Sequence, residues 1–502
     1  MSVLQSRAPA PEVAAPPVHQ FIAGRSVAGE GETIVVVNPG TEEIVAEVAG
    51  ASPGQVEAAI AAARGAYDSG VWSGLPAAER AEALRRLMAY LASQRERLVD
   101  LAVREAGCPI SSGSMAAQVH APLQHGLDVI DLFLHLPAFE ENPLPFAQRI
   151  TPRGGAIQSL RRYLPIGVVA AISAYNFPFY TNLWKVLPAL ITGNTVVLRP
   201  NPLTPLSALV FGEAAEAAGL PPGVLNVVAD KGAAGGVLLS THKDVDMVAF
   251  TGSSAVGQQV MVQAAASMKR LQLELGGKSA QIYLPDSVAA SRTAAAQVCL
   301  GHAGQGCAHG TRIFVPEAEK AEAVAAMAAA LANVRIGDPA DPATTMGPVI
   351  SAAQRDRCQR FVDLARDAGA RVVIGGKRPA SPGRGFFFEP TILDTPDNKN
   401  PAAQEEIFGP VVCVIGYRDL DHLVEMANDS PYGLSGYVNG KDVNQAIAVA
   451  SRIRTGTINV NGGLLSAYAS SGGWRMSGLA RERGVEGLRV YQQVQCMNIQ
   501  GA

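Results

Sequence analysis

Cysteine is scarce in this chain of 502 residues: there are six, widely separated, and no two have CxxC spacing. A protein of this size without a secretion signal seldom depends on a disulfide framework. The chain also lacks an HExxH motif and any Cys–His cluster with metal-ligand spacing, although two of its eight histidines, His302 and His309, lie close together in the sequence. These absences argue against zinc, and we expect no metal site.

The chain also lacks a strong charge of either sign and any long apolar run. Its formal net charge is −3, so nothing favours nucleic acid or an anionic membrane as a partner. The longest apolar runs, such as "IGVVAAISA" at 166–174, are too short to span a bilayer. Residues 1–18 contain Ala and Pro but not the apolar core of a signal peptide, and we expect them to be a flexible arm on a cytoplasmic protein.

What the chain does contain is an alternation of strands and helices. Between 163 and 283, helical patterns separate β-rich runs at 166–173, 194–200, 223–230, 245–252 and 271–277. This order is typical of βαβ units around a parallel sheet. Loops at the carboxyl ends of such strands share one crevice, where a dinucleotide commonly binds. The expected fold class is therefore α/β, with a doubly wound, Rossmann-like unit.

A second alternation begins after residue 285. We expect a helix over 287–303, a strand at 312–315, and helices over 317–333 and 351–368. A chain of 502 residues is too long for one ordinary core, so this part is expected to form a second α/β unit.

One cysteine lies among unusually small neighbours. In "HAGQGCAHG" (302–310), Cys307 is flanked by Gly306 and Ala308, so nothing bulky shields the thiol locally. With a disulfide and zinc disfavoured, two interpretations remain, a buried core cysteine and a nucleophile.

Other polar candidates lie where the expected strands end. "GSSAVG" (252–257) opens a helix after a strand, which suits a phosphate at a helix N-terminus. Glu274 ends a strand in "ELGGK", and Asn176 lies in the turn "AYNFP", where its amide is suited to an oxyanion. Each pattern is also common in ordinary turns and on surfaces, so none identifies a function alone.

Taken in order, these patterns resemble the NAD(P)-dependent aldehyde dehydrogenase superfamily. The resemblance extends from residue 21 to the end of the chain. The motifs that carry it are "AYNFPF" (174–179), "GNTVVLRP" (193–200), "FTGS" (250–253), "ELGGKS" (274–279), "GQGC" (304–307), "EEIFGPV" (405–411) and "SGLARERG" (477–484).

The resemblance implies an aldehyde dehydrogenase-like architecture. A nucleotide-binding domain is expected from 19–140 and 165–277, a catalytic domain from 278–478, and a β-rich oligomerisation arm from 141–164 and 487–502. Arms of this kind pair between subunits in the family, and an exposed strand edge invites such pairing. We therefore expect a homodimer or homotetramer.

The resemblance also implies catalytic roles for five residues. Cys307 matches the nucleophile, Glu274 the base that activates water, and Asn176 the side chain that holds the oxyanion. Lys185 and Glu482 match residues implicated in proton relay. The implied reaction oxidises an aldehyde to the acid through a thiohemiacetal and a thioester on the cysteine.

NAD is the expected cofactor, with measurable use of NADP. Where the family commonly has Lys beside the adenine ribose this chain has Arg199, and Pro202 replaces a frequent Glu that would repel a 2′-phosphate. The expected cofactor contacts are Ile172, Ser173, Arg199, Gly232, Phe250, Gly252, Ser253, Val256, Gly257, Leu275, Glu406 and Phe408.

The substrate is expected to be a small aldehyde, of apolar or aromatic character. Positions that match the family's substrate entrance are rich in aromatic residues, although packing alone would also explain some of them. Ser470–Ser471 replaces a Pro-Phe pair that is common near this entrance. The expected substrate-lining residues are Phe177, Tyr180, Trp184, Leu465 and Tyr468, with Leu464 beside them.

Three other functions stay open. A CoA-acylating aldehyde dehydrogenase would cleave the thioester with CoA, but such enzymes tend to lack a base at the position of Glu274. A cysteine hydrolase would pair Cys307 with His302 or His309, and would need no dinucleotide crevice. A binding protein that has lost catalysis would have no need of the Cys, Glu and Asn together.

Overall fold

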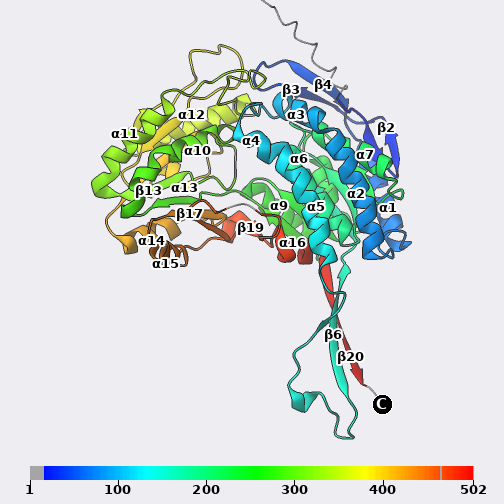
Figure 1. Ribbon diagram of the computed structural model, residues 1–502. Helices are drawn as coiled ribbons and strands as arrows, with labels where there is room; N and C mark the ends of the chain where they lie inside the picture. Colours follow the sequence, from blue (N-terminus) through cyan, green and yellow to red (C-terminus); the bar gives the residue numbers. More distant parts are fainter. Residues whose placement is uncertain (1–15, 464–465, 501–502) are drawn as a thin grey trace, which may run out of the picture.

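Two large sheets form the body of the protein, and a thin arm extends below it (Figure 1). The structure is a computed structural model that describes residues 16–463 and 466–500. Both large sheets are mainly parallel and carry helices on both faces. The predicted α/β class with a Rossmann-like unit is confirmed.

The first sheet has eight strands in the order β19-β11-β10-β7-β8-β9-β1-β2. Its five central strands are parallel, and β19, β1 and β2 extend it in antiparallel pairings. The bounds are β1 Gln20–Ile22, β2 Arg25–Val27, β7 Val168–Ile172, β8 Thr195–Arg199, β9 Leu225–Val227, β10 Met247–Thr251, β11 Arg270–Glu274 and β19 Gly478–Leu479.

Alternating side chains of this sheet enter two separate cores. In β7, Val169 and Ala171 pack with α2, α5, α6 and α7, whereas Val168, Ala170 and Ile172 pack with α1 and α9 on the opposite face. Strands buried on both faces are continuously apolar, as "VVAAI" is. The helix bounds are α1 Pro53–Asp68, α2 Ala77–Ser93, α3 Arg95–Arg104, α4 Gly113–Met115, α5 Ala121–Leu134, α6 Pro178–Ile191, α7 Leu206–Ala218, α8 Ala234–Thr241 and α9 Ser254–Ala265.

The second sheet has seven strands in the order β14-β15-β16-β13-β12-β17-β18, all parallel except β14. The strand bounds are β12 Ala280–Tyr283, β13 Arg312–Pro316, β14 Arg371–Ile374, β15 Thr391–Asp394, β16 Val411–Tyr417, β17 Ser435–Asn439 and β18 Thr457–Val460. The helix bounds are α10 Ala294–Leu300, α11 Lys320–Leu331, α12 Ala352–Asp367, α13 Pro401–Gln404, α14 Leu420–Asn428 and α15 Val443–Ala450. A separate hairpin joins β3 (Thr33–Val37) to β4 (Ile44–Ala49).

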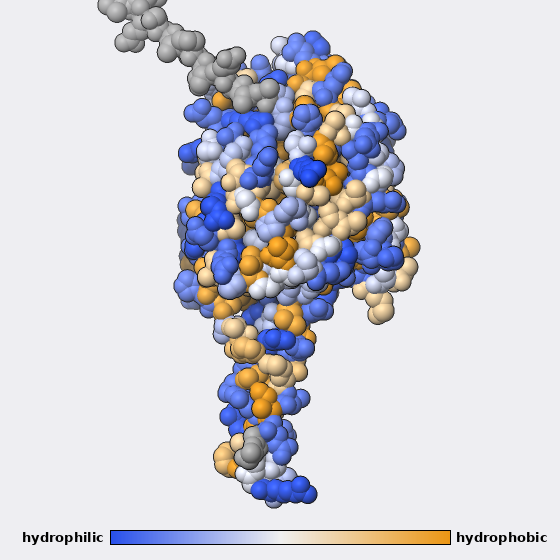
Figure 2. All heavy atoms as spheres, turned by 90° about the vertical axis from the view of Figure 1, so that its right-hand side faces the viewer, coloured by the Kyte–Doolittle hydropathy of each residue, from blue (hydrophilic) through white to orange (hydrophobic). Residues whose placement is uncertain are grey.

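The arm is a three-stranded antiparallel sheet. Its long strands, β6 (Ile157–Pro165) and β20 (Gln492–Gln500), pair along their full length, and the short β5 (Glu140–Glu141) pairs with β6. Strand β20 therefore has one open edge. Apolar side chains lie exposed along the arm between hydrophilic ones, among them Phe146, Val494 and Ile499 (Figure 2).

Two expected segments differ from the structure. The single helix predicted over 287–303 is a 3-10 helix over Pro285–Thr293, then α10, then a tight turn over His302–Gly304. His302, Ala303 and Gly304 all have left-handed backbone conformations, which no α-helix can include. Residues 487–490, predicted in the arm, belong to helix α16 (Gly484–Val490).

No helix in the described ranges is long and apolar enough to cross a membrane.

Candidate active site

A cavity of about 740 Å³ opens at the carboxyl ends of β7, β8 and β10. Cys307, Glu274 and Asn176 line it, and so do eleven of the twelve predicted cofactor contacts. The exception is Gly257, which instead packs against Leu275, because a Cβ there would lie 2.6 Å from the Leu275 side chain. The eleven are Ile172, Ser173, Arg199, Gly232, Phe250, Gly252, Ser253, Val256, Leu275, Glu406 and Phe408.

Helix α9 begins at the wall of this cavity. Ser253 is its N-cap and accepts a hydrogen bond from the backbone N–H of Val256. Gly252 and Ser254, at this end of the helix, line the cavity. The remaining N–H groups of the first turn and the positive end of the helix dipole therefore lie at the cavity wall. This end of the cavity is therefore suited to a phosphate group.

Two helices form an apolar slot beside this phosphate position. Val237 of α8 and Val256 of α9 both line the cavity, and their side chains are 41% and 42% exposed. Apolar side chains so exposed inside a cavity are suited to the two faces of a flat aromatic ring.

Arg199, at the end of β8, is not a free cation. Its Nε donates to Asp230 Oδ1 at 2.5 Å, and its terminal nitrogen donates to the Gly232 carbonyl, also at 2.5 Å. Both members of the ion pair are buried, with side chains 8% and 6% exposed. The Asp230 carboxylate therefore neutralises much of the positive charge of Arg199 in this corner of the cavity.

The loop that carries Cys307 depends on close backbone packing. A Cβ at Gly304 would overlap the Gly409 carbonyl, and a Cβ at Gly277 would overlap the carbonyl of Cys307 itself. Only glycine allows these approaches. They hold the thiol, which is half-buried, at the cavity wall between the two large sheets.

The Asn176 side chain reaches the same loop. Its Nδ2 donates to the Gln305 carbonyl at 2.7 Å, two residues before the cysteine. The backbone carbonyl of Asn176 accepts a hydrogen bond from Gln118 at 2.8 Å. The bond to Gln305 therefore directs the side-chain amide at the loop that carries Cys307, and the bond from Gln118 fixes the backbone of Asn176.

Glu274 belongs to a buried group of charges. Its Oε1 is enclosed and has no hydrogen-bond partner among the described residues. Burial and the Glu482 carboxylate raise its pKa well above the usual range, against the opposing charges of Lys185 and Arg481. Lys185 is fully buried on α6, and its Nζ lies 3.3 Å from Glu482 Oε1. Neither Lys185 nor Glu482 lines the cavity; they lie behind Glu274.

The thiol of Cys307 is in an unfavourable place for a negative charge. Burial raises its pKa to about 12, with further contributions from the carboxylates of Glu406, Glu274 and Glu482. The nearby histidines are kept neutral, since burial lowers the pKa of His302 to about 3 and that of His309 to about 4. In the described residues neither forms a hydrogen bond with Cys307, which argues against a Cys–His hydrolase.

The loop of Glu406 and Phe408 is fixed from behind by α12. Gln354 donates to the carbonyls of Ile407 and Phe408 at 2.8 and 2.7 Å, and Arg357 donates to those of Glu406 and Ile407. These bonds hold Phe408 in a left-handed conformation with φ 62°. Glu406 is thereby placed to accept a hydrogen bond from the Gly277 N–H at 2.9 Å.

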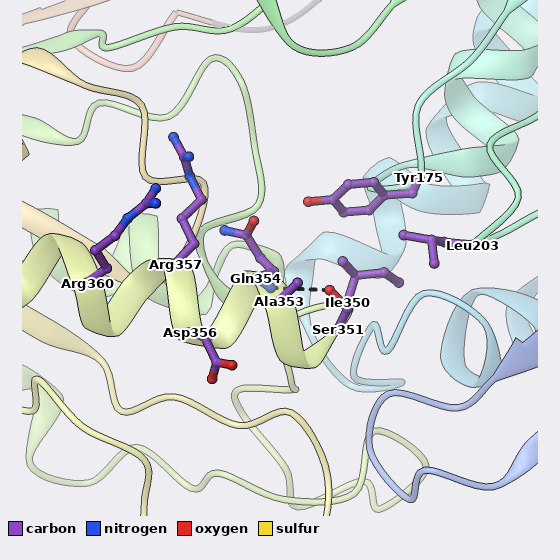
Figure 3. Close-up of a pocket in the computed structure, with 9 residues that line it drawn as sticks. All are labelled: Tyr175, Leu203, Ile350, Ser351, Ala353, Gln354, Asp356, Arg357 and Arg360. Atoms are coloured by element: carbon purple, nitrogen blue, oxygen red, sulfur yellow. Dashed lines mark hydrogen bonds between the residues drawn. The ribbon is translucent and has the colours of Figure 1, made fainter. Parts of the chain in front are cut away.

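A second, shallower cavity of about 500 Å³ adjoins the first. Figure 3 shows Tyr175 and Leu203 on one side of it and the α12 residues Gln354, Arg357 and Arg360 on the other. Tyr175, Gln354 and Arg357 line both cavities, so the second is an extension of the site.

Three predicted substrate-lining residues form a row of rings away from the large cavity. The rings of Phe177 and Tyr180 are 6.3 Å apart, and those of Tyr180 and Trp184 are 6.0 Å apart. Tyr468 is 55% exposed. Leu464 and Leu465 lie outside the described residues. Of Ser470–Ser471, Ser470 is held by Arg481, which donates to its carbonyl at 2.9 Å.

Sequence reasoning missed several lining or supporting residues. Asp230 and Tyr175 follow strands of the first sheet, so the strand-end argument applied to Asn176 would also have found them. Gln354 and Arg357 lie on an ordinary helix of the second unit, and no local pattern marks them. Among the described residues no cluster of three or more His, Cys, Asp or Glu could hold a metal.

Known proteins resemble this chain over nearly its whole length. A family model, the aldehyde dehydrogenase family, matches residues 26–497. The geranial dehydrogenase of Castellaniella defragrans is 38% identical over 487 residues, which cover 96% of this chain and 99% of that protein. A mutant aldehyde dehydrogenase C of Pseudomonas syringae, solved with NAD⁺ and octanal, has a TM-score of 0.89 at 36% identity and 98% coverage of both chains. The betaine aldehyde dehydrogenase of Staphylococcus aureus, solved with NAD⁺, has a TM-score of 0.91 at 32% identity, covering 96% and 94%.

Glu274→Gln should make the Cys307 thiol more reactive at a pH where Glu274 is ionised. Burial raises the pKa of the thiol most, and the carboxylates of Glu406 and Glu274 raise it further, so removal of the Glu274 charge lowers that pKa and increases the thiolate fraction. The rate of Cys307 alkylation by iodoacetamide, followed by peptide mass spectrometry from pH 6 to 10, should shift to lower pH. The exposed substitution Glu47→Gln is the control. A slower alkylation in Glu274→Gln would mean that Glu274 deprotonates the thiol instead.

Proposed function

The chain belongs to the aldehyde dehydrogenase family, and we propose that it oxidises an aldehyde to the carboxylic acid with NAD⁺ through a thioester on Cys307. The observation that carries this proposal is the shared cavity. A thiol, a carboxylate and an amide line one end of it, and a helix N-terminus with an apolar slot lines the other.

The residues of the cavity fit the cofactor. Val237 and Val256 would hold the adenine, Ser253 and the first turn of α9 the pyrophosphate, and Glu406 and Phe408 the nicotinamide end. When bound, NAD⁺ accepts the hydride that leaves the substrate carbon. NAD⁺ is also the cofactor bound in the structures of the Pseudomonas syringae and Staphylococcus aureus relatives.

In the first half-reaction, the Cys307 thiol loses its proton to solvent, the thiolate sulfur forms a bond to the aldehyde carbon, and the π electrons of the carbonyl move to its oxygen, which becomes an oxyanion. Asn176 Nδ2 has two N–H groups: one donates to the Gln305 carbonyl at 2.7 Å, and the other is available to donate to the oxyanion. One such donor lowers the barrier by about 3 kcal/mol in comparable sites. Loss of the hydride leaves a thioester on Cys307.

In the second half-reaction, water cleaves the thioester and Glu274 accepts the proton. Among the described residues its enclosed Oε1 has no hydrogen-bond partner, and burial raises its pKa, which makes it a stronger base than an ordinary carboxylate. The ion pair of Lys185 and Glu482 lies behind it and can carry the proton away from the cavity. A base in this position favours hydrolysis over transfer to CoA.

Cys307→Ala should abolish aldehyde-dependent NADH formation, because the thioester can form on no other group. Cys299→Ala is the matched control, since Cys299 lies earlier in the chain, on α10, and is fully buried, so that no substrate can reach it. The activity of both variants is measured as the increase in NADH absorbance with NAD⁺ and octanal. Activity in Cys307→Ala, or its loss in a folded Cys299→Ala, would contradict the proposal.

Asp230→Asn should increase the use of NADP relative to NAD. Asp230 neutralises Arg199, and its removal leaves a free guanidinium for a 2′-phosphate. A charge-assisted bond of this kind corresponds to roughly tenfold in the ratio of kcat/KM values. Asp68→Asn, whose carboxylate pairs with Arg64 at the surface, is the control. An unchanged ratio in Asp230→Asn would show that the pair does not set cofactor choice.

We also propose that the arm joins subunits into a homodimer or homotetramer. Val494 is 54% exposed on β20, which has an open edge. A lysine on such an edge opposes pairing, so Val494→Lys should shift the assembly to smaller species in light scattering. Val35→Lys, with a parent side chain 48% exposed on the β3–β4 hairpin, should not. A monomeric parent protein would contradict the proposal.

A further inference from the structure

A row of aromatic rings leads away from the nucleophile loop. The ring of His302, five residues before Cys307, lies 5.3 Å from that of Phe177, which directly follows Asn176. The row continues from Phe177 to Tyr180 and Trp184, at centroid distances of 6.3 and 6.0 Å. The row therefore runs from the segment that carries Cys307 along the first turns of α6.

A cation lies over the far end of this row. The guanidinium carbon of Arg483 is 5.3 Å from the ring centre of Tyr180 and 5.1 Å from that of Trp184. The residue is only 8% exposed, and its Nε is enclosed without a hydrogen-bond partner. In the described part of the chain, no hydrogen bond or ion pair to its side chain is present.

Among the described residues, no carboxylate forms an ion pair with Arg483. The preceding residue, Glu482, has its carboxylate on Lys185 at 3.3 Å. The neighbour His125, whose ring packs on Trp184 at 6.1 Å, has its pKa lowered by burial and by the charge of Arg483, against the opposing charge of Asp128.

A buried charge is normally paired, because its removal from water is costly. Contact with two aromatic faces offsets part of that cost. The planar fork of a guanidinium is also the group best suited to bind a carboxylate through two hydrogen bonds. Arg483 is therefore suited to bind an anion that comes from outside the protein.

We propose that Arg483 binds a carboxylate at the far end of the substrate, so that the preferred aldehydes carry an anionic group opposite the reacting carbonyl. This inference rests on the proposed function for the chemistry at Cys307, and it narrows the expected apolar or aromatic aldehyde to a class that joins an apolar body to a carboxylate.

The first test compares substrates that differ only in charge. We expect the parent protein to oxidise para-carboxybenzaldehyde with a higher kcat/KM than its methyl ester, and glutaric semialdehyde with a higher kcat/KM than pentanal. In Arg483→Gln the ratio of the charged to the neutral substrate should fall about tenfold or more, since a charge-assisted bond is lost. Arg483→Lys should retain part of the ratio. Arg85→Gln, which removes a surface cation on α2, should leave the ratio unchanged.

A second measurement separates this inference from the proposed reaction. Calorimetric binding of para-carboxybenzaldehyde and its methyl ester to Cys307→Ala, with NAD⁺ present, requires no turnover. Tighter binding of the carboxylate supports the inference even if no aldehyde is oxidised, a result that would overturn the proposed function alone. A parent protein that oxidises neutral aldehydes but shows no preference for the carboxylate in either measurement would overturn the inference.

Discussion

The site depends on one short antiparallel contact, the pairing of β19 with the edge of β11. Gly478 lies opposite Glu274 there, and the Ser477 carbonyl accepts a hydrogen bond from the Leu275 N–H at 3.0 Å. A Cβ at Gly478 would overlap the Leu273 carbonyl, so the contact requires glycine. It returns the chain from the second large unit to the first.

The pairing of β19 with β11 positions the residues that directly follow β19. Glu482 reaches Lys185 on α6, and the two charges surround Glu274. Arg483, the next residue, lies over the rings of the same helix. Glu274, the ion pair of Lys185 and Glu482, and the guanidinium of Arg483 are therefore held by a single docked segment, although they come from three distant parts of the chain. Burial raises the pKa of the Cys307 thiol, and the carboxylates of Glu274 and Glu482, together with that of Glu406, raise it further.

The sequence predicted those parts of the molecule that follow from local pattern. Strands buried on both faces, such as β7, and the βαβ order identified the fold class, and side chains at strand ends placed Asn176 and Glu274 at the cavity. The helix expected over 287–303 was wrong because residues 285–293 form a 3-10 helix, and the left-handed residues at 302–304 prevent the short α10 from continuing. The pairing of Arg199 with Asp230 and the position of Arg483 were not predictable, because each arises from packing between segments that are separate in sequence.

The central claim is that Cys307 forms a thioester that Glu274 helps to hydrolyse. Its most direct test is the intact mass of Glu274→Gln, quenched in acid seconds after mixing with NAD⁺ and octanal, followed by peptide mapping. The account predicts an octanoyl adduct that accumulates on the peptide containing Cys307, in amounts close to one per chain, while the parent protein shows little. An unmodified Cys307 in a variant that still forms NADH, or an acyl group on another residue, would contradict it.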